Sequence, residues 1–288
     1  MSVLSVEKLN KKYPGFALQD ISFSLQKGAI TGFIGRNGAG KTTTLKALLN
    51  FVHPDSGTIT FFGQSFRKHE LAIKEKIAFV SGGVDFYPHQ KLATITQVTR
   101  RFYPHWDDAA YRRYLSRFNL DERKTPAQLS AGMKVKYALT LALCHQASLL
   151  ILDEPTSGLD PISREDLLDA FVELIREQEL TIFFSTHITA DLEKCADNII
   201  YIRQGRLYAA DELEHFRNSY RLVQLAEPQL AQLPAEKLLG CKRTKTGYQA
   251  LVRAADLPLP GVEAIAADLD SIMVHLEKEG EQNDQATR

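Results

Sequence analysis

Short apolar segments alternate with amphipathic ones along most of this chain. Apolar and polar residues alternate in 2–9 and 20–25, whereas 30–34 and 149–152 are continuous apolar runs. Alternation with a period of two is typical of a strand with one buried face, and a continuous run is typical of a strand buried on both faces. The pattern therefore predicts strands of both kinds within one protein.

Further strands and helices follow from the same reasoning. Apolar runs bounded by turn residues predict strands at 58–63, 76–80, 181–185, 198–203 and 206–210. Helical spacing predicts helices at 42–49 and 163–177, and it dominates the amphipathic stretches 110–118 and 134–143. Residues from about 86 to 147 are therefore predicted to form a helical insertion in an otherwise α/β pattern.

The pattern changes again after about Ser219. Strands are predicted at 221–226 and 248–253, helices at 228–239 and 267–277, and a polar tail at 279–288. We therefore expect a first domain of residues 1–218, which contains the helical subdomain at about 86–147, and a small α+β accessory domain of residues 219–288.

Composition narrows the class of protein. The chain has 288 residues, of which 44% are hydrophobic and 24% charged, as in ordinary soluble globular proteins. Its 35 basic and 35 acidic residues cancel, so no overall charge attracts it to nucleic acid, and we expect no nucleic-acid partner. Cys144, Cys195 and Cys241 are far apart without metal-ligand spacing, and they are predicted to be packing residues.

One glycine-rich stretch lies between a predicted strand and a predicted helix. It runs Gly35-Arg36-Asn37-Gly38-Ala39-Gly40-Lys41-Thr42-Thr43 and matches G-x-x-x-x-G-K-[ST]. In that context the glycines leave backbone N–H groups free to face phosphate oxygens, and the helix adds the positive end of its dipole. Lys41 is predicted to reach the β- and γ-phosphates, and Thr42 to bind Mg²⁺. The alternative is a glycine-rich turn that only caps the helix.

Charged and titratable residues follow two of the predicted strands. Asp153 and Glu154 end the run 149–152, and His187 follows the strand 181–185. A right-handed strand–helix–strand crossover would place all three at the same edge of a parallel sheet, where ligands usually bind. A histidine at a strand end is, taken alone, more often structural than catalytic.

Two weaker signals accompany these residues. Ser130, in Leu129-Ser130-Ala131-Gly132-Met133, is placed to cap a helix whose start could bind an anion, although such caps are common. Tyr13 precedes the glycine-rich loop, where its ring could stack on a nucleotide base or pack on a hairpin.

Taken in order, these motifs resemble the nucleotide-binding subunit of an ABC transporter. The matching segments are Walker A at 35–42, the signature at 129–133, Walker B at 149–153, the D-loop at 157–160 and the switch histidine His187. The resemblance covers nearly the whole chain. It implies an α/β P-loop NTPase core with a helical subdomain insertion and a small C-terminal α+β appendage.

The resemblance also implies roles for individual residues. Glu154 would polarise the attacking water, His187 would contact the γ-phosphate, and Lys41 would complete the catalytic set. Asp153 and Thr42 would hold Mg²⁺, and Tyr13 would stack on the adenine of ATP. The further ATP-binding residues would be Gly35, Arg36, Asn37, Gly38, Ala39, Gly40, Thr43, Ser130, Gly132 and Asp160. In this family Ser130 and Gly132 of one subunit close on ATP held by another.

Partners and location follow from the same resemblance. One set of motifs implies a homodimer or a dimer with a related ATPase subunit. An integral membrane permease would hold that dimer at the cytoplasmic face of the membrane. The signature ending in Gly-Met and the segment 268–273 are similar to the ABC-2 branch, in particular bacterial acetoin-utilisation and peptide-antibiotic resistance ATPases, which suggests export. The alternatives are a soluble ABC ATPase acting on nucleic acid or ribosomes, and a nucleotide sensor without turnover.

The chain departs from the family at one motif. The strand 77–80 should lead into a Pro-Gln pair, but Ser81 and Gly82 follow it, so the Q-loop glutamine is missing. We expect a water in place of its amide oxygen, with Ser81 and Asp85 as less favoured stand-in ligands. Coupling to the permease would then depend on the backbone hinge at 82–83.

Overall fold

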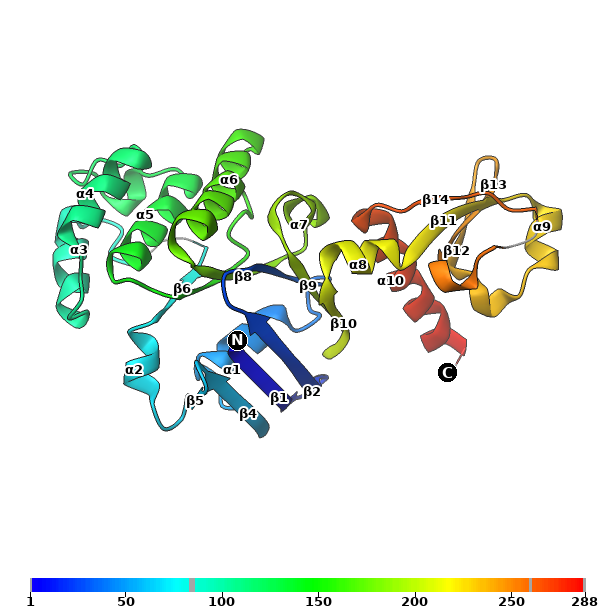
Figure 1. The fold of residues 1–288 in the computed structure, drawn as a ribbon, viewed down its shortest axis with the longest axis horizontal. Helices are drawn as coiled ribbons and strands as arrows, with labels where there is room; N and C mark the ends of the chain where they lie inside the picture. The colour runs from blue at the N-terminus through cyan, green and yellow to red at the C-terminus, as the bar shows by residue number, and fades with distance from the viewer. Residues whose placement is uncertain (1, 83–85, 259–260, 287–288) are drawn as a thin grey trace. The chain divides into compact units, whose positions relative to one another are not determined.

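A computed structural model describes residues 2–82, 86–258 and 261–286 of the chain (Figure 1). The chain divides into two compact units, Met1–Ala210 and Asp211–Arg288. The stand-in candidate Asp85 and one residue of the predicted hinge, Gly83, lie outside the described residues.

A six-stranded sheet forms the centre of the first unit. Its strand order is β10-β9-β3-β8-β7-β6, and the β9-β3-β8-β7-β6 pairs are parallel. The strands are β3 (Ile30–Ile34), β6 (Ile77–Ser81), β7 (Leu149–Asp153), β8 (Thr181–Thr186), β9 (Asn198–Arg203) and β10 (Arg206–Glu212). The four leucine and isoleucine residues of β7 are fully buried, as expected for a parallel strand covered on both faces.

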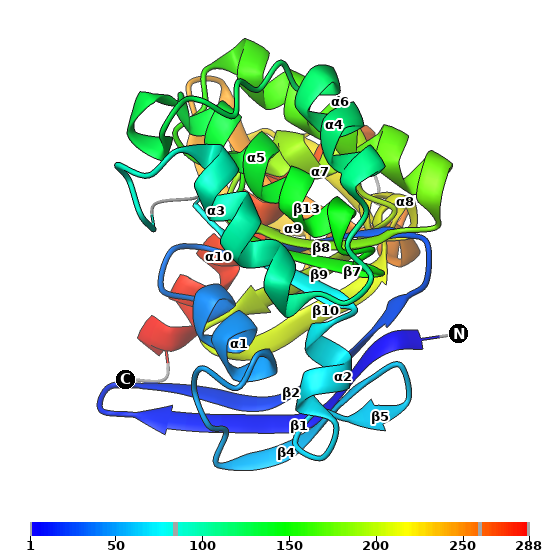
Figure 2. The ribbon, with the colours of Figure 1, turned by 90° about the vertical axis from the view of Figure 1, so that its left-hand side faces the viewer.

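Helices cover both faces of this sheet. Figures 1 and 2 show α1 (Lys41–Leu48) on one face, between the sheet and the strands β1 and β2, and α6 (Pro161–Gln178) on the other. With α6 lie α5 (Ala131–Cys144) and α7 (Thr189–Cys195). Leu45 and Leu48 of α1 join Phe33 and Ile151 of the sheet in one hydrophobic core.

The predicted strands near the N-terminus pair into a second, antiparallel sheet. Its order is β2-β1-β4-β5, with β1 (Ser2–Tyr13), β2 (Phe16–Gln26), β4 (Ser56–Phe61) and β5 (Gln64–Ser65). Its apolar face packs on the core around α1, which is why apolar residues alternate along β1 and β2.

The insertion is helical, as predicted. It contains α3 (Leu92–Thr99), α4 (Asp108–Arg117), α5 and the short 3₁₀ turns Arg100–Phe102 and Pro126–Gln128; the five-residue α2 (Glu70–Lys74) precedes it. Tyr111 and Tyr137 are buried between α3, α4 and α5, where both hydroxyls contact Thr96. Burial raises the pKa of Tyr111 to about 12 and also raises the pKa of Tyr137, so both stay neutral.

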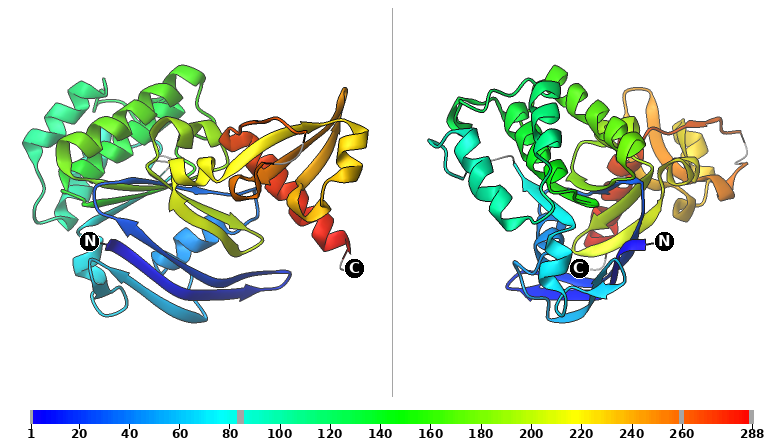
Figure 3. Two further views of the ribbon diagram at one scale, coloured as in Figure 1. Left: turned by 45° about the vertical axis from the view of Figure 1, so that its right-hand side comes forward. Right: turned by 60° about the vertical axis from the view of Figure 1, so that its left-hand side comes forward.

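The second unit is an antiparallel sheet with one long helix, shown on the right-hand side of Figure 3, left panel. The sheet order is β12-β13-β11-β14, and α10 (Leu269–Ala286) packs against β12 and β13. The strands are β11 (Tyr220–Leu225), β12 (Leu239–Thr244), β13 (Gly247–Arg253) and β14 (Ala264–Ala266), and α8 (Leu213–Asn218) precedes them.

Some element predictions for this unit are wrong. The helix predicted at 228–239 is only α9 (Glu227–Gln232) and the turn Ala235–Lys237, because Leu233 precedes Pro234 and a residue before proline avoids the helical conformation. The polar tail predicted at 279–288 is helical as far as Ala286, since α10 continues through it. Strands β12 and β14 of this unit were not predicted, because they are short or lack a clear alternation, and neither was the two-residue β5 of the first unit.

Candidate functional site

The polar residues predicted at strand ends do meet at one edge of the six-stranded sheet. In the parallel register Asp153 lies beside Ser185 on β8 and beside Ser81 on β6, and Ile34 lies beside Thr186. The glycine-rich loop follows β3 at this edge, and Glu154 and His187 follow β7 and β8. Three separate segments of the chain therefore converge there.

Two glycines of the loop are required by its geometry. Gly40 precedes α1 with a φ of 113°, and a Cβ atom at this position would lie 2.7 Å from Cδ2 of Leu18. At Gly35 a Cβ atom would lie 2.3 Å from the carbonyl oxygen of Ile202. Only glycine avoids both the strained backbone and these clashes, so the loop can wrap closely around the start of α1.

Lys41 lies with its ammonium group inside the loop. Its Nζ donates to the carbonyl oxygen of Gly35 at 2.6 Å and to that of Arg36 at 3.4 Å, and it pairs with Oε1 of Glu154 at 3.3 Å. The side chain is only 5% exposed. A buried ammonium group satisfied by carbonyl and carboxylate oxygens can exchange these partners for the oxygens of an entering anion.

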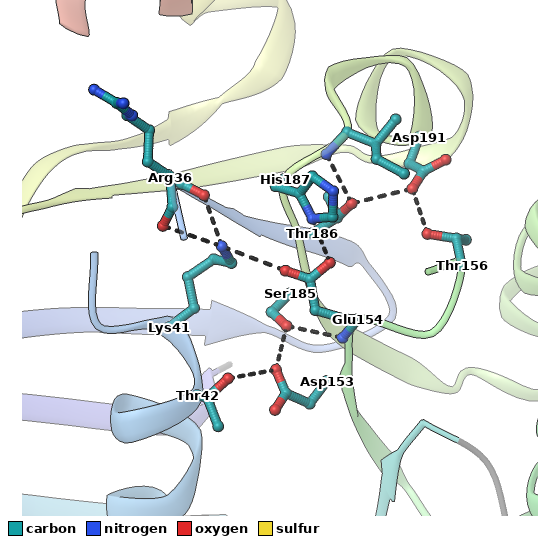
Figure 4. A network of polar contacts seen from close by, with 12 residues as sticks. Arg36, Lys41, Thr42, Asp153, Glu154, Thr156, Ser185, Thr186, His187 and Asp191 are labelled. Atoms are coloured by element: carbon teal, nitrogen blue, oxygen red, sulfur yellow. Dashed lines mark hydrogen bonds and ion pairs between the residues drawn. The ribbon is translucent and has the colours of Figure 1, made fainter. Parts of the chain in front are cut away.

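Glu154 connects this ammonium group to His187. Oε2 of Glu154 lies 2.7 Å from Nδ1 of His187, so one carboxylate contacts both the lysine and the histidine (Figure 4). Glu154 has a φ of 51°, in the left-handed region that non-glycine residues rarely adopt. Its backbone N–H donates to Oγ of Ser185 at 3.0 Å, which helps to hold this turn.

Asp153 is buried beside Thr42 and Ser185. Its Oδ1 accepts from Oγ1 of Thr42 at 3.2 Å and from Oγ of Ser185 at 2.6 Å. Among the residues that the structure describes, no group of three or more His, Cys, Asp or Glu side chains could hold a metal ion. Thr42 and Asp153 instead offer two hard oxygen donors, which suits Mg²⁺, a cation that keeps several waters and binds phosphate oxygens.

A cleft of about 680 Å³ opens over these residues. It is lined by Gly15, Phe16, Arg36, Asn37, Gly38, Gly40, Lys41, Thr42, Thr43, Glu154, Ser157 and His187. Gly15, Phe16 and Ser157 were not predicted as site residues. Tyr13 is not among the lining residues; it is 37% exposed, with Nζ of Lys11 5.6 Å from its ring centre. Because Tyr13 pairs with Phe16 across the β1–β2 hairpin, the two aromatic rings are neighbours in sequence and in the sheet.

The structure does not bring Ser130, Gly132 or Asp160 into this cleft. Ser130 caps α5, as predicted, and its Oγ accepts from the backbone N–H of Met133 at 3.3 Å while remaining exposed. Gly132 is buried where α5 approaches α6, and a Cβ atom there would lie 3.2 Å from Cβ of Ser163. None of the three residues therefore lines the cleft that contains Lys41 and Glu154.

Asp160 caps α6 with its carboxylate. It accepts from the backbone N–H groups of Ile162 and Ser163 and from Oγ of Ser163, the last at 2.6 Å. The hydroxyl of Ser163 and these backbone groups lower the pKa of Asp160, so it stays ionised at neutral pH. Ser81, at the end of β6, is exposed beside Asp153 in the sheet register.

A second polar cluster lies behind the cleft, and sequence reasoning missed it. Asp191 of α7 is fully buried and accepts from Oγ1 of Thr156 at 2.6 Å and from Oγ1 of Thr186 at 3.1 Å. Its other oxygen contacts Nε of Arg164. The only signal in the sequence is a carboxylate on the apolar side of a short helix.

Comparisons with known proteins find ATP-binding proteins of ABC transporters. The family model described as ABC transporter matches residues 18–157. The chain is 32% identical to the bacitracin transport ATP-binding protein BcrA of Bacillus licheniformis, over 76% of this chain and 73% of that protein. It is 34% identical to the SkfA peptide export ATP-binding protein SkfE of Bacillus subtilis (strain 168), over 72% of this chain and 88% of that protein. A solved structure of the ATP-binding subunit of an ABC transporter superposes with a TM-score of 0.67 at 29% identity, covering 75% of this chain and 92% of that one.

Proposed function

The chain belongs to the family of ABC transporter ATP-binding subunits, and from this premise we propose how its cleft binds and hydrolyses ATP. Such a subunit is an ATPase that powers a membrane-spanning partner, and the transporter relatives favour this function over a soluble ABC ATPase acting on nucleic acid or ribosomes. The observation that carries the proposal is the contact of one carboxylate, Glu154, with both Lys41 and His187 beside the glycine-rich loop.

We assign the triphosphate of ATP to the loop 35–43. The backbone N–H groups of the loop and the start of α1 would bind phosphate oxygens, and the ammonium group of Lys41 would exchange its carbonyl partners for them. The adenine would lie toward the β1–β2 hairpin, where Tyr13 remains our candidate for stacking. Phe16 is the aromatic residue that lines the cleft.

Thr42 and Asp153 would hold Mg²⁺ in this site. Two oxygen donors from the protein fit an ion that takes its remaining ligands from water and phosphate. When bound, the ion neutralises charge that develops on the phosphate oxygens. Ser185 donates to the same oxygen of Asp153 as Thr42 does, and this second hydrogen bond helps to orient the carboxylate. A water in place of the missing Q-loop amide remains our expectation.

Hydrolysis would depend on Glu154 and His187. The Glu154 carboxylate would orient a water and accept its proton as the water attacks the γ-phosphorus, and the bond from that phosphorus to the bridging oxygen of ADP would break. His187, held by Glu154 at 2.7 Å, would contact the γ-phosphate and keep that geometry. Lys41 would stabilise the negative charge on the transferred group.

The active unit would be a dimer, either with a second copy or with a related ATPase subunit. Ser130, Gly132 and Asp160 lie outside the cleft of their own chain, so they could complete the cleft of a partner subunit. The start of α5 would then add a helix N-terminus to the phosphates.

A membrane permease would complete the transporter. No helix within 2–82, 86–258 and 261–286 is long and apolar enough to cross a bilayer. For the contact we propose a groove of about 500 Å³ whose lining includes Phe51, Phe79, Phe86 and Tyr103. Residues 77–81 of β6 form part of its wall, and β6 ends at Ser81, which pairs with Asp153 in the sheet. This contact would hold the subunit at the cytoplasmic face of the membrane. Relatives named for bacitracin transport and for peptide export favour export as the direction of transport.

Replacement of Glu154 by glutamine tests the hydrolysis mechanism. Glu154→Gln keeps the shape of the side chain but removes the base, so we expect phosphate release to be abolished while Mg²⁺-dependent ATP binding remains. The matched control is Glu173→Gln, which changes an exposed glutamate of α6 that pairs with Arg117. Turnover of Glu154→Gln within about twofold of the wild-type rate would contradict the assignment.

A further inference from the structure

Asp191 is a fully buried carboxylate that lies outside the cleft and takes no part in the mechanism proposed above. It is shown at the upper right of Figure 4, where dashed lines join it to Thr156 and Thr186. Oδ2 accepts from both hydroxyl groups, at 2.6 Å and 3.1 Å, and Oδ1 contacts Nε of Arg164. A buried charge that has hydrogen-bond donors on both oxygens is held in one orientation.

The three donors come from segments that carry different parts of the site. Thr186 is the last residue of β8 and directly precedes His187. Thr156 follows Glu154 by two residues, and Arg164 lies one turn beyond Asp160 on α6. Thr156 and Arg164 therefore flank the segment 157–160 on both sides, and both are joined to Asp191.

Thr186 also fixes the backbone beyond the histidine. Its Oγ1 donates to Asp191 and accepts from the backbone N–H of Ile188 at 3.0 Å. The hydroxyl group of Thr186 thus connects the residues before and after His187, and the ring of His187 contacts Glu154. A change at Asp191 would release this hydroxyl group without touching any residue that lines the cleft.

We propose that Asp191 is a positioning residue that links His187 to the segment 157–160. Its carboxylate accepts hydrogen bonds from Thr156, Arg164 and Thr186. The position of Thr186, directly before His187, is therefore coupled to the positions of both ends of the segment 157–160. A movement of 157–160, such as contact with a partner subunit would cause, would reach His187 through this carboxylate. The role rests on the proposed function, in which Glu154 and His187 act on ATP.

Three variants remove the link at different points. Asp191→Asn removes the charge but keeps the size, and Thr156→Val and Thr186→Val each remove one donor. Misplacement of His187 should lower kcat by about tenfold or more in each variant, while KM for ATP stays within about threefold, because the binding loop is untouched. Thr186→Ser restores the hydroxyl group and should recover kcat to within about threefold of the wild type.

A matched control separates positioning from a general loss of stability. Thr181 is equally buried on the same strand, but its Oγ1 accepts from the backbone N–H of Gly28, away from the site. Thr181→Val should therefore leave kcat within about twofold of the wild type even where its melting temperature falls as far as that of Thr186→Val. Equal losses of kcat in Thr181→Val and Thr186→Val, or no rescue by Thr186→Ser, would overturn the proposal.

A second measurement needs no turnover. The NMR resonances of the His187 ring can be assigned by their absence in His187→Gln. These resonances should shift in Asp191→Asn, Thr156→Val and Thr186→Val. They should not shift in Thr181→Val. Unchanged resonances in all three variants would overturn the positioning role. Lack of ATPase activity in the wild-type protein would instead contradict the proposed function, and the resonances would still test the link.

Discussion

The last two residues of β8 and the residue that follows it each contact a different acidic side chain. Ser185 donates to Asp153 at 2.6 Å, Thr186 donates to Asp191 at 3.1 Å, and Nδ1 of His187 lies 2.7 Å from Glu154. Two of these contacts, Ser185 with Asp153 and His187 with Glu154, join the ends of β7 and β8, so they require the observed register between these strands. A slip of one residue would separate both pairs, whereas Asp191 lies on α7, which follows β8 in the chain.

The aromatic residues of the β1–β2 hairpin are candidates for stacking on the adenine of ATP. Base stacking on an aromatic ring contributes about 1–3 kcal/mol, so Tyr13→Ala should weaken ATP binding by about tenfold or more, and Tyr13→Phe should be nearly silent. The measurement is titration with ATP and, as a control, with inorganic triphosphate, whose affinity should not change because it has no base.

Phe16→Ala provides the comparison, because Phe16 lines the cleft and Tyr13 does not. A loss of ATP affinity in Phe16→Ala alone would move the stacking role from Tyr13 to Phe16. Equal losses in Tyr13→Ala and Tyr13→Phe would point to the hydroxyl group and against stacking.

At the scale of elements, α10 packs closely on β12 at Gly240. A Cβ atom there would lie 1.9 Å from the carbonyl oxygen of His275, and the backbone N–H of Gly240 donates to Oε2 of Glu279 at 2.9 Å. His275 is fully buried: its Nδ1 donates to the Gly240 carbonyl at 2.8 Å, and its Nε2 has no partner among the described residues. Burial lowers the pKa of His275, and the nearby charges of Lys242 and Lys278 lower it further.

This lowered pKa predicts an acid-sensitive C-terminal unit. Above the unfolded-state pKa of about 6.5 the imidazole is neutral in both states; below it, the unfolded chain binds a proton more readily than the folded one, so the free energy of unfolding falls as the pH falls. His275→Asn can still donate to the Gly240 carbonyl but cannot titrate. Denaturant unfolding at about pH 7 and pH 5 should therefore show a smaller loss of stability in the variant than in the wild type.

His145 provides an internal control for this comparison. It is buried in the first unit, where burial lowers its pKa as well, and it is present in both proteins. Its contribution to the loss of stability at low pH is therefore the same in the wild type and in His275→Asn, and it cancels when the two losses are compared. Identical losses between pH 7 and pH 5 in the wild type and in His275→Asn would show that His275 is not the titrating group.

At the scale of the whole molecule, Ser130 and Gly132 of the signature and Asp160 of the D-loop do not line the cleft of their own chain, whereas Ser157 of the D-loop does. Ser130 is exposed at the start of α5, and Asp160 caps α6. A complete site would therefore need a second subunit whose α5 faces the bound nucleotide.

We expect ATP binding to produce a dimer of this chain. In the Glu154→Gln background, which should retain ATP, light scattering is expected to show a dimer when Mg²⁺ and ATP are added. Ser130→Arg should prevent it by placing bulk and charge at the contact. The control Ser116→Arg changes an exposed serine of α4 in the same subdomain and should leave the dimer intact. A dimer that forms equally with Ser130→Arg would place the contact elsewhere.

Most strands of the first unit, its main helices and the local motifs could be predicted from the sequence alone. The apolar run 30–34 is β3 to the residue, and Ser130 caps α5 as its position predicts. The glycine-rich loop was also readable, because Gly40 must adopt a positive φ directly before a helix. These features depend on neighbours within a few residues, and hydrophobic periodicity and backbone sterics record such local constraints directly.

Contacts between residues far apart in the chain could be read only from the tertiary structure. Glu154 lies between Lys41 and His187, Asp191 joins Thr156 to Thr186, and Tyr13 is absent from the lining of the cleft where Phe16 is present. In the C-terminal unit, pairing in the sheet produced β12 and β14, which lack a clear alternation of their own. These outcomes depend on sheet register and on packing between segments far apart in the chain, and local periodicity does not specify such contacts.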